Sequence, residues 1–181
     1  AAPALTAAEL AALDVAAVAL GQRSSRESFL VSGLLPGALV LRAPLPVGGA
    51  VAQSVSESAR AALTAALQLA ARRLPAGELE RAQRRLVQAS LQRGELPGGR
   101  AQRLGAFALL GIDEAAYETS LRALTPFELQ ATLRRYLTLE NLTLAVAAPR
   151  RSSPAIDPNR LSALIATTAA TVARSAAPPA S

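Results

Sequence analysis

The sequence contains no histidine and no cysteine in 181 residues. Imidazole and thiolate groups form the usual zinc sites of proteins, and they also serve Ser-His-Asp and Cys-His catalysis. Without them this chain can build none of those sites, and it can form no disulfide. We therefore predict that it holds no catalytic residue and no metal ligand, so that hydrolytic chemistry would have to come from another domain or chain.

Methionine and lysine are also absent, and aromatic residues make up only 3% of the chain. Because Met is missing even at position 1, we interpret the sequence as a processed or excised piece. All 19 basic residues are arginine, which together with the excess of alanine is typical of the coding bias of a GC-rich, bacterial genome. With few aromatic rings, the core must pack Leu, Val and Ala between closely approaching helices.

The formal net charge of +6 permits anionic partners, but the arginines are scattered along the chain. They form pairs at 72–73, 84–85, 134–135 and 150–151, on or beside predicted amphipathic helices or at a strand end. Solvated helix faces explain this pattern better than nucleic-acid binding, because no aromatic platform accompanies the charge. We expect no nucleic-acid partner. We also expect no membrane span, and the sequence leaves cytoplasm and periplasm equally open.

Capping signals and leucine spacing predict a series of helices. Thr6 and Glu9 form a capping box before a helix that we expect to stop at Gly21. Ser54–Glu57 offers a second box, and Thr125–Glu128 combines an N-cap Thr with Pro at the first helical position. The later helices are predicted over 54–74, 78–93, 100–110, 125–137 and from 157, and one more is expected to begin at Asp113, which caps it.

Three segments have the alternation expected of strands. Ala38–Ala43 and Val47–Gln53 are separated by a short proline-containing connection, which predicts an antiparallel hairpin. Asn141–Ala148 alternates as a half-buried strand, whereas residues 22–33 are expected to form a loop and a short helix. Strands clustered apart from a block of helices predict an α+β fold, with a two-layer, mostly antiparallel sheet backed by helices.

Three further segments carry a recognisable pattern. The first, residues 13–26, is a helix end followed by a glycine turn and Ser-Arg; the second joins 78–86 to 100–105. The third, residues 124–144, combines Thr-Pro-Phe-Glu-Leu, Arg-Tyr-Leu-Thr and a segment opened by Asn-Leu-Thr. Their order and spacing resemble the insulinase/pitrilysin-type zinc peptidases, in the two-domain form similar to mitochondrial processing peptidase.

This resemblance implies that residues 1–149 form an α+β half-shell domain, with 150–181 as a C-terminal helix and loose tail. The family's active domain holds zinc through an inverted His-x-x-Glu-His motif, so a chain without His resembles the inactive C-terminal domain. The resemblance implies that Arg26, with Ser25, helps to bind a peptide substrate. Zinc would then be held by a catalytic domain or subunit, in a homo- or heterodimer.

The chain departs from the family at one assisting residue. The family's Tyr is missing from residues 33–40, and Glu27-Ser28 stands where an apolar pair is usual. Tyr117 and Tyr136 lie on predicted helices, where we expect them to be packing residues. Two functions are thus compatible with the sequence: a peptide-binding, non-catalytic domain of a zinc endopeptidase, or a structural or interaction module derived from that family without a proteolytic role.

Overall fold

The computed structural model describes residues 5–24, 27–31, 38–42, 51–147 and 157–176. Within these ranges the chain forms seven α-helices, one 3-10 turn and one two-stranded sheet. In chain order they are α1 Ala7–Ser24, β1 Glu27–Val31, β2 Ala38–Arg42, α2 Val51–Ala71, α3 Ala76–Gly94, α4 Pro97–Leu110, α5 Glu114–Ala123, α6 Pro126–Tyr136, η1 Leu139–Asn141 and α7 Pro158–Ala176.

The prediction of an α+β fold with a two-layer, mostly antiparallel sheet is wrong, because the described residues are mainly helical and hold a single hairpin. In the described part of the predicted third strand, Asn141 ends η1 and residues 142–147 form no strand. Alternation favours a half-buried extended segment, but a strand also needs a neighbour to share its backbone hydrogen bonds. The described part of the chain supplies no such neighbour to residues 142–147.

The hairpin forms between other partners than those predicted. Glu27–Val31 is a strand, not a loop and short helix, and it pairs antiparallel with Ala38–Arg42, so that Phe29 lies opposite Val40. Leu30, Leu39 and Leu41 pack against the core from one face of this hairpin. Strand Ala38–Ala43 was therefore predicted correctly, apart from its last residue, which lies outside the described ranges.

The second capping box is wrong, and so is the described end of the second predicted strand, because α2 already begins at Val51. Residues 47–50 of that strand lie outside the described residues. Gln53 Nε2 donates to Glu57 Oε1 at 2.8 Å, and Ser56 Oγ donates to the carbonyl of Ala52 at 2.9 Å. These are contacts between residues four apart, which only a helix brings together. Local helical contacts thus prevail over the β-like alternation of this stretch.

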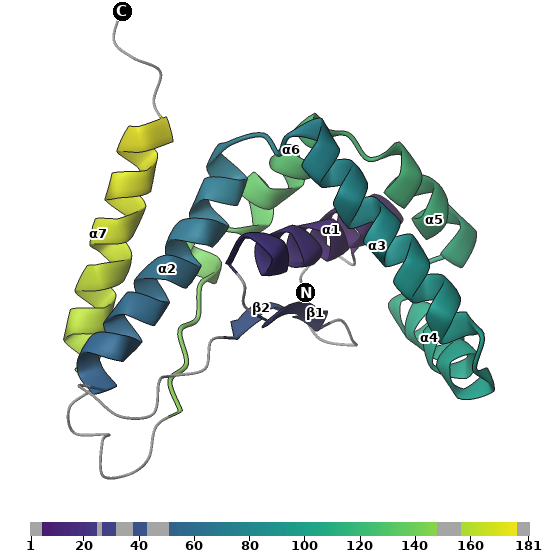
Figure 1. Cartoon of the computed structure of the whole chain (residues 1–181), viewed down its shortest axis with the longest axis horizontal. Coiled ribbons are helices and arrows are strands. Elements are labelled where there is room, and N and C mark those ends of the chain that lie inside the picture. Colours follow the sequence, from purple (N-terminus) through teal and green to yellow (C-terminus); the bar gives the residue numbers. More distant parts are fainter. Residues whose placement is uncertain (1–4, 25–26, 32–37, 43–50, 148–156, 177–181) are drawn as a thin grey trace, which may run out of the picture.

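Helix α1 is the centre of the molecule. Ala11, Ala12, Val15, Ala16 and Leu20 are fully buried. Helices α2, α3, α5 and α6 and the hairpin all pack on α1, which Figure 1 shows crossing the middle of the fold. A helix buried on every side must be apolar all round, and small alanines let its neighbours approach closely. The core consists chiefly of Leu, Val and Ala, as the composition predicts.

The predicted caps at the ends of three helices are confirmed. The backbone N–H of Glu9 donates to Thr6 Oγ1, and Thr125 forms the reciprocal capping box with Glu128. Asp113 accepts a hydrogen bond from the N–H of Ala116 at 2.9 Å. The predicted stop at Gly21 is wrong: α1 continues to Ser24, where its last turn is held by an ion pair from Arg23.

Helix α7 lies against α2 on the outer side of the fold, as Figure 1 shows. Val55 of α2 and Thr168 and Val172 of α7 are buried but do not belong to the main core cluster. Arg72 Nη2 donates to the carbonyl of Ser175 at 2.8 Å near the end of α7. Among the described residues, no helix is long and apolar enough to cross a membrane, as the sequence predicts.

Candidate functional site

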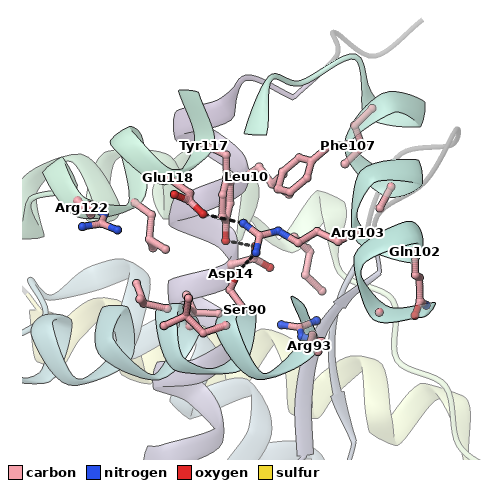
Figure 2. A pocket seen from close by; sticks show the side chains of 18 residues that line it. Leu10, Asp14, Ser90, Arg93, Gln102, Arg103, Phe107, Tyr117, Glu118 and Arg122 are labelled. Carbon is pink, nitrogen blue, oxygen red and sulfur yellow. Dashed lines mark hydrogen bonds and ion pairs between the residues drawn. The ribbon is translucent and has the colours of Figure 1, made fainter. Parts of the chain in front are cut away.

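A pocket of about 390 Å³ opens between α1, β1, α3, α4 and α5. Its apolar wall includes Leu10 of α1, Leu30 of β1 and Leu86 of α3. Three of its polar residues, Asp14, Tyr117 and Arg103, lie close together, as Figure 2 shows. The pocket is therefore built by elements far apart in the sequence, and its chemistry depends on how those elements pack.

Asp14 and Tyr117 form the inner polar pair of this pocket. The phenolic OH of Tyr117 donates to Asp14 Oδ2 at 2.7 Å. Burial raises the pKa of the Asp14 carboxyl above its ordinary value, and the hydrogen bond from Tyr117 and the charge of Arg93 only partly offset this. Burial, followed by the Asp14 charge, also raises the pKa of Tyr117, so the phenol stays protonated and remains a donor.

Arg103 joins α4 to its neighbours around the same pocket. Its guanidinium lies 2.5 Å from Glu114 Oε1 and 2.7 Å from Glu118 Oε1, and it donates to Ser90 Oγ. It also lies 5.9 Å from the centre of the Phe107 ring. Figure 2 shows Arg103 reaching across the pocket toward Glu118 and Ser90. Because these partners come from α3 and α5, Arg103 holds three helices together.

The arrangement is suited to holding a side chain or small apolar group, with one carboxylate available for a polar contact. Phe107 and Tyr117 add two tilted rings, 5.2 Å apart between centroids, to the leucine-rich wall. Apolar walls with a few convergent polar groups are the usual composition of ligand pockets. Among the described residues, no three acidic side chains gather closely enough to hold a metal ion.

The two residues that the resemblance implied for substrate binding, Ser25 and Arg26, lie outside the described residues, between the end of α1 and the start of β1. Their predicted role stays a prediction. The packing role expected for the two tyrosines is confirmed. Tyr117 is buried against the core, and Tyr136 is half-buried and donates to Glu9 Oε1 at 2.9 Å.

Asp14 and Arg103 were not predicted from the sequence as pocket residues. Asp14 carried one usable signal, since it is a lone acidic residue within the apolar stretch between Leu10 and Leu20. A carboxyl group at such a position needs a partner when its helix is buried. Arg103 carried none, because its acidic partners in α5 lie beyond a helix end and a turn whose direction local patterns do not specify.

Replacing Asp14 by asparagine is expected to make stability less sensitive to pH. A carboxyl whose pKa is raised on folding favours the folded state when protonated, and that stability is lost as the pH rises from its ordinary pKa through the raised value. The variant should therefore equal or exceed the parent in stability at pH 7, and lose this advantage by pH 3.5. Urea unfolding of variant and parent at both pH values measures the difference in their free energies of unfolding. The other carboxyls contribute equally to both proteins, so their contributions cancel.

The matched control is Glu140→Gln, which changes an exposed carboxyl in η1. It should leave the difference between the two pH values unchanged. If Asp14→Asn instead lowered the free energy of unfolding more at pH 7 than at pH 3.5, the result would contradict the conclusion that burial makes the charged form of this carboxyl unfavourable.

Comparisons of the chain with models of known families, with curated proteins and with solved structures found no match.

Proposed function

We propose that this chain is the non-catalytic domain of a zinc endopeptidase, which shapes the substrate chamber and helps a His-bearing partner domain to hold a peptide. Two features of the sequence support the proposal. Three segments resemble that peptidase family in order and spacing, and the chain contains no His or Cys to hold the metal itself. In this arrangement the partner supplies zinc, the bound water and the glutamate base.

The observation that carries the proposal is that the three segments pack on one another. Arg23, in the first segment, forms an ion pair of 2.9 Å with Glu78, which begins the second. Glu9, one turn before the first segment, binds Arg135 at 2.6 Å and Tyr136 at 2.9 Å in the third. Segments that carry a family pattern are expected to form one unit. Helix α1 holds most of the first segment, and α3 and α6, which hold parts of the second and third, both pack on it, while α4 with residues 100–105 packs on α3.

Arg26 is the residue that we propose for direct contact with the peptide, with Ser25 beside it. A guanidinium presents a planar set of donors that can bind a carbonyl or carboxylate oxygen with two hydrogen bonds. Such contacts position a peptide without chemistry of their own. The pocket at Asp14 offers a second, apolar place in the same domain for a side chain of that peptide.

The second candidate function is a structural or interaction module derived from the same family. The missing Tyr between residues 33 and 40 favours it. The exposed side chains of Phe29 and Val31, on the outer face of the hairpin, and of Leu142 and Leu144 also favour it, because apolar surface is typical of protein contacts. Such a module would bind its partner without affecting peptide hydrolysis.

Mixing the chain with its cognate His-bearing partner tests the proposal. We expect hydrolysis of a mixed fluorogenic peptide library that neither protein shows alone, and we expect a zinc chelator to abolish it. Activity requires both proteins, because the metal and the peptide-holding groups would be on different domains. No gain of activity in the stoichiometric mixture would contradict the proposal.

Arg26→Ala separates the two candidate functions in the same assay. Loss of a bidentate contact to the substrate should lower kcat/KM of the mixture by about tenfold or more. Arg60→Ala, an exposed arginine on α2, is the control and should leave kcat/KM unchanged. A complex that forms and is equally active with either variant would favour the structural module.

A further inference from the structure

A second hollow, of about 380 Å³, lies along α3 on the side away from the Asp14 pocket. Arg81, Arg84, Arg85 and Gln88 line it from α3, and Gln22 lines it from α1. The four α3 residues follow the spacing that places side chains on one face of a helix. Residues of α3 that line the other pocket, such as Leu86 and Ser90, lie on the opposite face.

The charge of this hollow is largely unbalanced. Among the described residues, its three guanidinium groups have one acidic partner, Glu80, which lies 3.6 Å from Arg84 in a pair that is about two-thirds exposed at both side chains. The other acid in the first turns of α3, Glu78, is already paired with Arg23 at 2.9 Å. Like charges three and four residues apart destabilise a helix, so an anion bound among these arginines would reduce the repulsion between them.

The donors in the hollow suit an oxyanion. Each guanidinium carries five N–H donors in a planar fork, and the amides of Gln22 and Gln88 add neutral donors from two different helices. Arg81 lies back along α3, with its Nη1 3.7 Å from the point where a β-carbon on Gly77 would stand. Bidentate contacts of arginine to phosphate and carboxylate oxygens are stronger than neutral hydrogen bonds.

We propose that the hollow lined by Gln22, Arg81, Arg84, Arg85 and Gln88 binds an oxyanion with two or more negative charges. The ligand is a phosphoryl or polycarboxylate group of a small ion or molecule. The site is separate from the peptide-holding role proposed above and does not depend on it, because it uses none of the same residues and faces away from the Asp14 pocket.

Calorimetric titration of the full chain with inorganic pyrophosphate and with citrate tests this site. We expect saturable binding at low ionic strength that weakens as salt is added. Stronger binding of pyrophosphate identifies a phosphoryl group as the source, and equal or stronger binding of citrate identifies a polycarboxylate. Saturation by either ion supports the proposal, and absence of binding by both at low salt overturns it.

Paired variants distinguish a built site from the general positive charge of the chain. Arg81→Gln combined with Arg85→Gln should lower the affinity by about tenfold or more. Arg60→Gln combined with Arg134→Gln removes the same charge from exposed positions elsewhere and should change the affinity by less than about twofold. An equal loss in both pairs would overturn the proposal. Far-UV circular dichroism of each variant verifies that the fold is retained.

Discussion

Replacing Leu20 by alanine is expected to lower the free energy of unfolding by about 3–5 kcal/mol. Leu20 is completely buried near the end of α1, the helix on which α2, α3, α5, α6 and the hairpin all pack. Truncation removes its apolar surface from the core and leaves a cavity that the surrounding helices cannot easily close. Urea unfolding followed by far-UV circular dichroism measures the loss.

Leu91→Ala is the matched control for this experiment. The residue type and the substitution are the same, but Leu91 of α3 is 66% exposed. Its replacement should change the free energy of unfolding by less than about 0.5 kcal/mol. If the two variants lost similar stability, α1 would not be the centre of the core.

Replacing Tyr117 by alanine is the second change with a large expected effect, a loss of about 3–5 kcal/mol. The ring is buried, packs against Phe107 and carries the hydroxyl that binds Asp14. Tyr117→Phe keeps the ring and removes only that donor. It should therefore cost about 1–2 kcal/mol, since the Asp14 carboxylate loses a hydrogen bond in a poorly solvated position.

Tyr136→Phe provides the comparison, because it also removes a hydroxyl bound to a carboxylate. Glu9 keeps other donors after this change: the backbone and hydroxyl groups of Thr6, and Arg135. Glu9 is still stabilised by these donors, whereas Asp14 loses the hydrogen bond from its side-chain donor, so Tyr136→Phe should lower the free energy of unfolding by under about 1 kcal/mol. A larger loss at Tyr136 than at Tyr117 in the same urea titrations would contradict the roles given to the two pairs.

Several features fixed by neighbouring residues could be predicted from the sequence, although the capping box at Ser54–Glu57 and the helix stop at Gly21 could not. The boxes at Thr6 and Thr125 and the cap at Asp113 depend on contacts three residues apart, and all three form as predicted. Sheet content could not be predicted in this way. The stretch 142–147 alternates like a strand, yet whether it becomes one depends on a partner strand from elsewhere, and none of the described residues provides it.

The contacts that form the pocket were even harder to predict from the sequence, because they join residues far apart in the chain. Asp14 and Tyr117 are 103 residues apart in the sequence, and only the packing of α5 on α1 brings them together. Arg103 reaches acids 11 and 15 residues further on because side chains of α4 and α5 meet at the pocket. Residue types alone could exclude a metal site built from His and Cys, but they could not place these three side chains in one pocket.

The central position of α1 has a consequence for how the chain folds during synthesis. Helix α1 emerges from the ribosome before α5 and α6, and its contacts with them require residues about a hundred positions later. Until those arrive, its apolar surface remains accessible to other chains and to chaperones, and closing such distant contacts is slow. Nascent chains that end before Tyr136 should therefore be bound by chaperones, whereas chains that include α6 should become resistant to proteases.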